Sequence, residues 1–419
     1  MEANSEKKEK FILVGVHTGR RDYINDTTEK SMEELDELVK TAGGESVASL
    51  IQNRAEVENA TYIGEGKLEE LGEAVENMGA DAVVFDDELS PVQLRNITDA
   101  LGCKVLDRSM LILDIFAMRA KSGEGKLQVE LAQLFYRLPR LRGLGVQMSR
   151  TGAGIGTRGP GETRLETDRR HIQRRISALQ AEIEEMKKHR ELIRNRRKKD
   201  GVITAAIVGY TNAGKSTLLN TLTDAGIFAE DKLFATLDPT SRAITLNDNR
   251  RILLVDTVGF IRKLPHHLID AFKSTLEEAA VADFLIHVVD ISDDDAENRI
   301  KVVESVLSDI GAGAKSVVGV FNKCDKRPEI TSAPRLYDEN VLMSAKNKTN
   351  IAELIKAIEN TAPGRKREVT ACIPYSMGAV VSELHSTQKV LSEEYTDRGT
   401  LIKMLVDSKM YERIQRYCL

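Results

Sequence analysis

Two glycines, a lysine and a serine between residues 205 and 220 have the spacing of a phosphate-binding loop. The stretch reads AAIVGYTNAGKSTLLN and contains Gly209-x-x-x-x-Gly214-Lys215-Ser216. Glycines at these places let the backbone wrap an anion and turn N–H groups toward phosphate oxygens. Lys215 would reach the β and γ phosphates, and the Ser216 hydroxyl would coordinate Mg²⁺. The residues predicted to surround the phosphates are Gly209, Tyr210, Thr211, Asn212, Ala213, Gly214, Lys215, Ser216 and Thr217.

Two later segments could complete a triphosphate site. RILLVDTVG ends in Asp256-Thr257-Val258-Gly259, where the carboxylate can hold Mg²⁺ through water and the Gly259 N–H can approach the γ-phosphate. Between the two motifs, LFATLDPTSR offers Thr236 and Thr240 as further hydroxyl ligands. A segment that contacts the last phosphate and loses it on cleavage acts as a switch.

A third group of residues would select the base. The apolar run SVVGVFNKCD ends in Asn322-Lys323-Cys324-Asp325. Asp325 can accept hydrogen bonds from the N1–H and 2-amino group of guanine, a pair of donors that adenine does not present. Ser344-Ala345-Lys346 would support the base through the Ala345 N–H. These motifs, in this order, predict a guanine nucleotide switch domain that hydrolyses GTP to GDP.

Strands and helices alternate before this domain. Phe11–His17, Val47–Ile51 and Ala80–Asp87 are expected to be strands, and the helix Ser31–Gly43 is expected to begin with a capping box of Ser31 and Glu34. Such alternation predicts a parallel sheet. Gly66-Lys67 resembles part of a second phosphate loop, but the following Ser or Thr is missing, so a glycine-led helix start is the preferred interpretation.

Two long helices are expected next. Apolar residues recur every three or four positions in each, which predicts a hairpin of antiparallel helices with one seam. The predicted seam residues are Leu127, Leu131, Leu134, Leu138 and Leu141 in the first helix, and Ile172, Ile176, Leu179, Ile183 and Met186 in the second.

The predicted tip of the hairpin, 143–163, is a glycine-rich loop between basic helices. From residue 137 to 200 there are 18 Lys and Arg against 8 Asp and Glu, which gives this segment +10 and leaves −15 for the rest of a chain whose net charge is −5. A flexible connector is one explanation, but the density of one charge favours contact with structured RNA through phosphates. The arginines expected to bind RNA are Arg150, Arg158, Arg164, Arg169, Arg170, Arg174 and Arg175, with Arg140 and Arg142 beside them.

Composition restricts the other classes of function. No apolar run approaches the roughly 20 residues of a membrane span, so a cytoplasmic protein without membrane contacts is expected. The protein is also expected to be a monomer and not to bind DNA. The 4 cysteines are far apart and form no disulfide or zinc pattern. Trp is absent and aromatic residues are 5% of the chain, which disfavours a base-stacking platform.

Together the motifs resemble one family. GYTNAGKST, FATLDPT, DTVGFI, NKCD and SAK, preceded by GTRGPGETRLETDRR on a basic helix, are similar to the HflX family of GTPases, related to the Obg group. The resemblance implies a ribosome-associated GTPase that binds the 50S subunit and the 70S ribosome, places its glycine-rich loop near the peptidyl transferase centre in 23S rRNA, and splits stalled or stored ribosomes under stress. It also implies that Ser216 and Thr236 are the direct Mg²⁺ ligands and that Phe234 and Ala235 lie at the nucleotide.

Three positions bear on the rate of hydrolysis. Phe260 stands where many small GTPases have a glutamine that positions water, which predicts slow intrinsic hydrolysis stimulated by the large subunit. The expected catalytic groups are Lys215, Thr236 and Gly259.

Asn212 could help to coordinate K⁺. The pair His266-His267 has no visible acidic partner in the sequence and is expected to face solvent.

The expected architecture is a multidomain α/β chain. The predicted domains are residues 1–108 (parallel α/β), 109–200 (helical hairpin), 201–366 (phosphate-loop GTPase) and 367–419 (α+β, in the order βαββα). Two functions remain open: a GTPase that splits ribosomes, and a GTP-gated assembly or regulatory factor that binds without splitting. ATP-driven RNA remodelling is disfavoured by Asp325.

Overall fold

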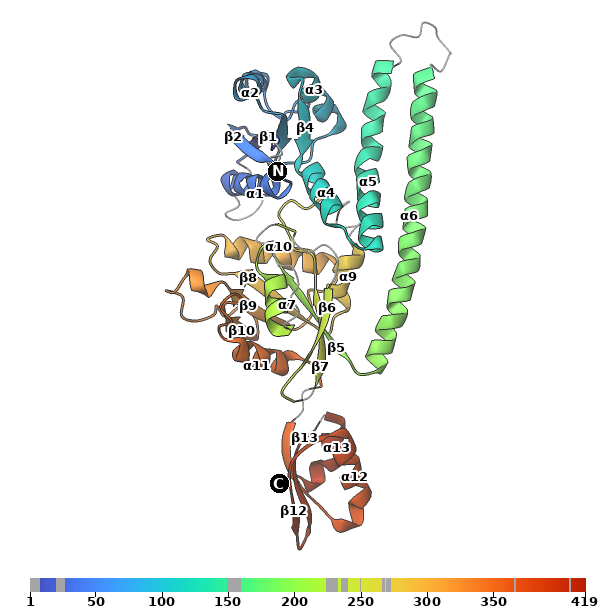
Figure 1. Cartoon of the computed structure of the whole chain (residues 1–419), viewed down its shortest axis with the longest axis vertical. Helices are drawn as coiled ribbons and strands as arrows, with labels where there is room; N and C mark the ends of the chain where they lie inside the picture. The colour runs from blue at the N-terminus through green and yellow to red at the C-terminus, as the bar shows by residue number, and fades with distance from the viewer. Residues whose placement is uncertain are drawn as a thin grey trace, which may run out of the picture.

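The computed structural model describes residues 8–19, 27–148, 160–223, 233–234, 240–248, 250–265, 268, 273–364, 367–406 and 408–419. Three sheets lie in these residues, and most of the helices that cover each sheet lie between its strands in the chain. Figure 1 shows the first two sheets stacked along the long axis, the helical hairpin α5–α6 beside them, and the third sheet at the C-terminal end. The predicted multidomain α/β architecture is confirmed.

The N-terminal sheet is parallel, as predicted, with strand order β2-β1-β3-β4. Its fourth strand has only 4 residues and was not predicted from the sequence. The elements are β1 (Lys10–His17), α1 (Thr28–Thr41), β2 (Glu45–Asn53), α2 (Glu65–Met78), β3 (Ala82–Phe85), α3 (Pro91–Leu101) and β4 (Lys104–Asp107).

The capping box predicted for the first helix is wrong. α1 begins at Thr28, and the side chain of Thr27 accepts the capping hydrogen bond from the Lys30 N–H. Ser31 lies inside the helix instead, where its hydroxyl donates to Asp86 Oδ2 at 2.6 Å. Glu34 is also buried, and its carboxylate accepts a hydrogen bond from Arg108 of another element. Both side chains therefore bond to residues far away in the sequence and do not cap the helix.

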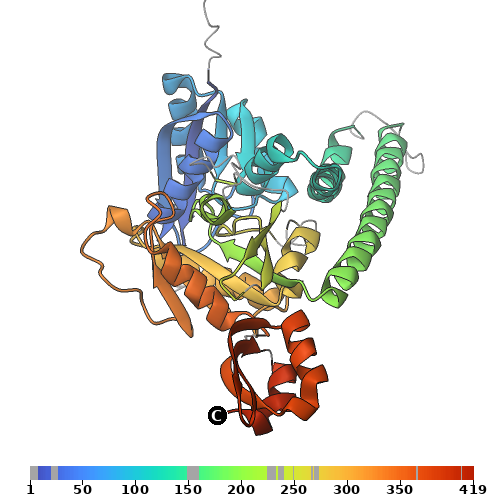
Figure 2. The same cartoon turned by 60° about the horizontal axis from the view of Figure 1, so that its bottom comes forward.

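The predicted hairpin of antiparallel helices is formed by α5 (Gly123–Met148) and α6 (Pro160–Lys199). Leu131, Ile176 and Leu179 are buried at the seam between them. Met186 was predicted to belong to this seam but is 37% exposed. The preceding helix α4 (Arg108–Arg119) packs into the core of the N-terminal sheet rather than into the seam. In Figure 2 the hairpin lies to one side of both sheets.

The helices extend further toward the tip than predicted. Residues 143–148 continue α5 and residues 160–163 begin α6, so the loop predicted at 143–163 is wrong at both ends. An established helix gains one hydrogen bond for each added residue, which offsets the cost of about 1 kcal/mol for a glycine. Arg150 and Arg158 lie outside the described residues.

The second sheet has six strands in the order β10-β9-β8-β5-β7-β6, with only β6 antiparallel to its neighbour. Its apolar side chains form a core around β5 and β8. The elements are β5 (Ile203–Gly209), α7 (Lys215–Thr223), β6 (Thr240–Thr245), β7 (Arg251–Asp256), α9 (Lys273–Val281), β8 (Phe284–Asp290), α10 (Ala296–Asp309), β9 (Val317–Asn322), η2 (Cys324–Lys326), β10 (Glu339–Leu342) and α11 (Ile351–Thr361).

The C-terminal elements follow the predicted βαββα order and form an antiparallel sheet, β11-β13-β12. They are β11 (Arg367–Ile373), η3 (Tyr375–Met377), α12 (Gly378–Thr387), β12 (Lys389–Thr396), β13 (Gly399–Val406), α13 (Ser408–Ile414) and η4 (Gln415–Tyr417). In the part of the chain that the structure describes, no helix combines the length and apolarity that a bilayer span requires.

Candidate nucleotide site

The phosphate-binding loop joins β5 to α7, and two glycines in it are fixed by close contacts. Gly209 has φ of 152° and Gly214 has φ of 97°. A Cβ atom would lie 2.3 Å from the Val288 carbonyl oxygen at Gly209, and 2.3 Å from Asn322 Nδ2 at Gly214. Both positions therefore require glycine for space as well as for backbone angle. Asn212 also has positive φ, 61°.

Lys215 is buried at the start of α7. Its ammonium donates to the backbone carbonyls of Gly209, at 3.1 Å, and Tyr210, at 2.8 Å. Burial lowers the pKa of Lys215 to about 8, although the nearby Asp256 carboxylate opposes this shift. Because an ammonium group has three donors, these two bonds aim the group and leave one hydrogen for a phosphate oxygen.

Ser216 and Asp256 provide oxygen atoms suited to magnesium. The Ser216 hydroxyl donates to Asp256 Oδ2 at 2.7 Å, and Asp256 is fully buried at the end of β7. Hydroxyl and carboxylate oxygens are the hard ligands that Mg²⁺ prefers. Ala235 and Thr236 lie outside the described residues, so the threonine ligand stays a prediction. Thr240, the alternative ligand, pairs with Asp256 in the β6–β7 ladder.

At the base end, Asn322 joins two loops. Its Nδ2 donates to the Ala213 carbonyl at 2.9 Å, and its Oδ1 accepts from the Ala345 N–H at 2.9 Å. The Ala345 N–H predicted to support the base thus has an acceptor within the protein. The Ser344 hydroxyl donates to Asp325 Oδ1 at 2.5 Å, which fixes the carboxylate predicted to bind guanine. Lys323 forms an ion pair with Asp290 at 2.7 Å, whereas Lys346 is exposed.

The segment after Asp256 lies against the phosphate-binding loop. The Phe260 N–H donates to the Gly209 carbonyl at 3.1 Å, and the Thr211 N–H donates to the Phe260 carbonyl at 2.8 Å. Gly259 lies so close to the loop that a Cβ atom would be 2.9 Å from Lys215 Nζ. The Phe260 side chain is 1% exposed and belongs to the apolar core. Its backbone rather than its ring therefore faces the loop.

Two residues predicted to bind nucleotide place their side chains elsewhere. The Tyr210 hydroxyl donates to Glu34 of α1 at 2.5 Å. The Phe234 ring packs edge-on against Phe116 of α4, with 4.7 Å between ring centroids. Glu34 itself was missed as a residue near the site, because its sequence position offered only a helix-cap pattern.

The arginines of the hairpin have different surroundings. Arg169, Arg170 and Arg174 are exposed on α6. Arg175 instead forms a two-bond ion pair across the hairpin with Glu130 of α5, at 2.7 and 2.8 Å. Arg164 lies in α6, but its side chain is outside the described part of the structure. The charges of Arg169, Arg170 and Arg174 therefore face the solvent.

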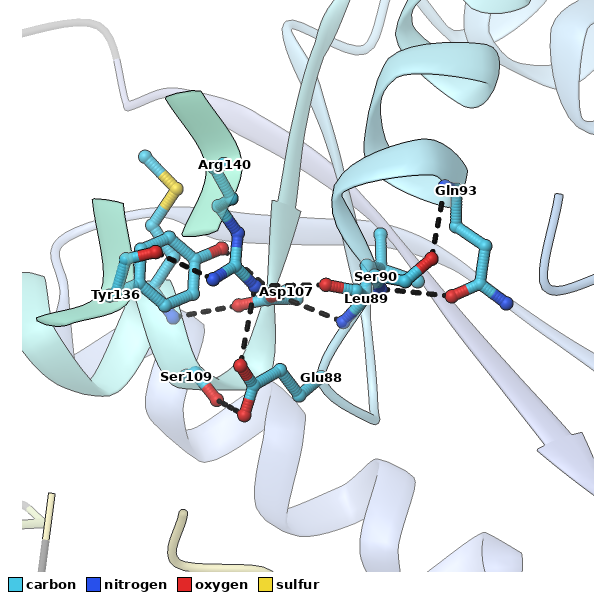
Figure 3. A network of polar contacts seen from close by, with 9 residues as sticks. Glu88, Leu89, Ser90, Gln93, Asp107, Ser109, Tyr136 and Arg140 are labelled. Carbon is cyan, nitrogen blue, oxygen red and sulfur yellow. Dashed lines mark hydrogen bonds and ion pairs between the residues drawn. The ribbon is translucent and has the colours of Figure 1, made fainter. Parts of the chain in front are cut away.

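Arg140 has a structural role that its sequence context did not indicate. It lies in α5 and donates to the Leu89 carbonyl at 2.8 Å and to Asp107 at 3.2 Å, as Figure 3 shows. Its guanidinium carbon is 3.3 Å from the centroid of the Tyr136 ring. These contacts fasten the hairpin to the N-terminal sheet, and they turn the Arg140 guanidinium toward the protein.

Three family models match successive parts of the chain. Residues 29–117 match "GTP-binding GTPase N-terminal", residues 119–197 match "GTP-binding GTPase Middle Region", and residues 204–323 match "50S ribosome-binding GTPase". The boundaries between these matches fall at the end of α4 and at the junction of α6 and β5.

Relatives that match nearly the whole chain share one name with each other, GTPase HflX. The chain is 50% identical to GTPase HflX of Caldanaerobacter subterraneus subsp. tengcongensis, over 100% of this chain and 96% of the relative. It is 42% identical to GTPase HflX of Escherichia coli, over 90% of this chain and 91% of that one. A GTP-binding protein from Sulfolobus solfataricus, solved in complex with GDP, is 28% identical over 84% of this chain and 98% of the other, with a TM-score of 0.44.

Proposed function

Because the chain belongs to the HflX family of GTPases, we propose that it uses GTP to control its attachment to the ribosome and to split stalled or stored ribosomes. The chain hydrolyses GTP, and residues 204–323, which contain the phosphate-binding loop, match the model "50S ribosome-binding GTPase". The proposed partners are the 50S subunit, the 70S ribosome and 23S rRNA, and the protein acts as a cytoplasmic monomer. In this proposal, the glycine-rich segment that links α5 and α6 approaches the peptidyl transferase centre when the protein binds the 50S subunit.

One observation carries the proposed coupling between GTP and the basic hairpin. The helix α9 follows the segment 256–263, which would sense the γ-phosphate. Lys187 of α6 forms an ion pair with Glu277 of α9 at 3.0 Å, and Arg194 of α6 forms another with Glu278. The proposal is that a movement of the phosphate-sensing segment is passed to α9, and from α9 to the hairpin through these two ion pairs.

The described residues divide the work of hydrolysis. Lys215 holds the phosphates, the Gly259 N–H orients the last of them, and Asp325 selects guanine. Ser216 and Asp256 would hold Mg²⁺, and Thr236, which lies outside the described residues, is proposed to complete the ligand set. When bound, the ion neutralises charge on the phosphate oxygens. The buried Phe260 ring cannot orient water, so this chain leaves part of the acceleration to its ribosomal partner.

Sucrose gradients separate this function from the alternative of an assembly or regulatory factor. Intact 70S ribosomes are incubated with the protein and a non-hydrolysable GTP analogue, and with GDP as the control. New 30S and 50S peaks with the analogue support splitting. Co-migration with undivided 70S particles overturns splitting and favours the alternative.

The monovalent cation is part of the same proposal. Asn212, held at φ 61° in the loop, would supply a side-chain oxygen to K⁺ at the phosphates. GTP hydrolysis is measured in KCl and in NaCl at equal ionic strength. A lower rate in NaCl than in KCl supports the site if the Asn212→Ala variant no longer shows this difference. Equal rates of the unchanged protein in the two salts dismiss the site.

A further inference from the structure

The side chain of Tyr210 leaves the phosphate-binding loop and enters the N-terminal unit. It is 4% exposed. Its hydroxyl donates to Glu34 Oε1 at 2.5 Å and accepts from the backbone N–H of Arg262 at 2.8 Å. One hydroxyl thus joins the loop that holds phosphate, the segment that follows Gly259, and helix α1, which lies next to α10 in Figure 1.

Glu34 is fixed in turn by buried charges. Its Oε2 accepts from Arg108 Nη2 at 2.7 Å, and Arg108 Nη1 donates to Asp86 Oδ1 at 2.8 Å. The other oxygen of Asp86 accepts from Lys263 Nζ at 2.5 Å. Because Lys263 follows Arg262 in the chain, the contacts close into a circuit. The Tyr210 circuit consists of Tyr210, Glu34, Arg108, Asp86, Lys263 and the Arg262 backbone.

Burial makes this circuit costly to open at any single place. Arg108 and Asp86 are each 1% exposed and Glu34 is 5% exposed. Removal of one partner leaves a buried charge without its counter-charge, which is far more costly than the loss of a surface ion pair. Burial and the neighbouring Glu34 carboxylate also raise the pKa of Tyr210 well above its ordinary value. The tyrosine therefore keeps the proton that it donates.

The circuit acts on the part of the chain that must meet the γ-phosphate. Three backbone groups tie residues 260–262 to residues 209–211: the Phe260 N–H, the Phe260 carbonyl and the Arg262 N–H. The first two bond to loop backbone, which is present whatever the side chains are. The third bonds to the Tyr210 hydroxyl, so only this contact depends on a particular side chain. Gly259 immediately precedes the tied residues, so their position limits where Gly259 and its N–H can lie.

From this geometry we infer that Glu34, acting through the Tyr210 hydroxyl, is a positioning residue for GTP hydrolysis. Glu34 lies outside the residues assigned to nucleotide and metal, and it holds residues 260–262 against the phosphate-binding loop from the N-terminal unit. The inference rests on GTP hydrolysis and is independent of ribosome splitting, so either can fail without the other.

Tyr210→Phe tests this role because it removes the hydroxyl and keeps the buried ring. The kcat for GTP hydrolysis by the full-length protein without ribosomes is expected to fall about fivefold, as for the loss of one hydrogen bond. The KM for GTP is expected to stay within about twofold, since the loop N–H groups and Lys215 are untouched. Amide hydrogen exchange at residues 260–262 is expected to become faster. An unchanged or higher kcat, or a change confined to KM, overturns the inference.

Glu34→Gln and the double variant decide whether Glu34 acts through Tyr210. If it does, the double variant is no slower than the slower single variant, because both substitutions break one link. Fold-losses that multiply in the double variant overturn the inference. Tyr136→Phe is the matched control: it removes another buried tyrosine hydroxyl, bonded to Asp107 at 2.8 Å outside the circuit. This control is expected to leave kcat unchanged, and an equal loss there would show a general effect of packing and overturn the specific role.

Discussion

Asp325 lies in the short helix η2 with one carboxylate oxygen fixed by the Ser344 hydroxyl at 2.5 Å. Its role as the guanine acceptor leads to a prediction. Asp325→Asn replaces an acceptor by a donor opposite the N1–H of guanine, so the Kd for GTP should rise by about 100-fold, or roughly 3 kcal/mol. Ser344→Ala removes only the support and should cost about 1 kcal/mol.

Competition binding measures this change. The two variants and the unchanged protein are titrated with a fluorescent GDP analogue and displaced by GTP or ATP. Discrimination between GTP and ATP that survives Asp325→Asn would contradict the assignment of the base.

His287 on β8 makes stability depend on pH. It is buried, with Nδ1 2.7 Å from the Tyr337 hydroxyl, and burial lowers the pKa of His287 to about 3. An unfolded histidine titrates near 6.5, so between these pH values the unfolded chain binds more protons than the folded one. Stability from this residue is therefore complete above pH 6.5 and falls as the pH falls toward 3.

His287→Asn removes the titration and keeps a polar side chain beside Tyr337. Between pH 7.5 and 5.5, the unchanged protein should lose about 1.4 kcal/mol more unfolding free energy than the variant. Denaturant unfolding of the nucleotide-free protein at both pH values measures the difference. Equal losses in the two proteins would show that His287 is not buried in neutral form.

Helix α6 has two classes of basic side chain, and only one is expected to contact RNA. Arg169, Arg170 and Arg174 are exposed near the tip, whereas Arg175 holds Glu130 across the seam. Neutralising the three exposed arginines should weaken 50S binding and lower the slope of log K against log salt by about 2 to 3. Arg175 stays unchanged in this variant, so that the hairpin keeps the ion pair between Arg175 and Glu130.

A control with equal charge change lies on the same helix. Lys188, Arg196 and Lys199 are also exposed, but they lie toward the opposite end of α6. Their neutralisation should leave the salt slope nearly unchanged. Filter binding to purified 50S subunits at several KCl concentrations gives both slopes, and equal slopes for the two triple variants would place the RNA contact elsewhere.

At the scale of the whole molecule, the GTP site depends on partners outside its own sheet. Glu34 of the N-terminal unit bonds to Tyr210 of the phosphate-binding loop, Phe116 of α4 packs on Phe234, and the hairpin forms an ion pair with α9. With Phe260 buried, no side chain at that position can hold the attacking water. Addition of 50S subunits should therefore raise kcat about tenfold or more, within the range of partner-stimulated GTPases.

This prediction is checked by phosphate release under multiple turnover. The protein is assayed alone, with 50S subunits and with 30S subunits at equal concentration. The 30S reaction is the control and should match the protein alone. A rate that is the same in all three reactions would remove the case for stimulation by the large subunit.

The sequence by itself determined the chemistry that is encoded locally. Gly209 to Ser216, Asp256 to Gly259, and Asn322 to Asp325 are short contiguous patterns, and each follows the strand that positions it. The apolar repeat also predicted the seam at Leu131, Ile176 and Leu179, because helical periodicity is a local property. The parallel N-terminal sheet and the order of the C-terminal elements were readable for the same reason.

Only the tertiary structure decided what the charged side chains do. Glu34 and Tyr210 are 176 residues apart, and Arg140 meets Asp107 from 33 residues away. Ser31 and Glu34 fit a helix cap in the sequence, yet both are used by distant partners. A buried charge must find its counter-charge wherever the fold provides one, so its role depends on packing between elements that no local spacing encodes.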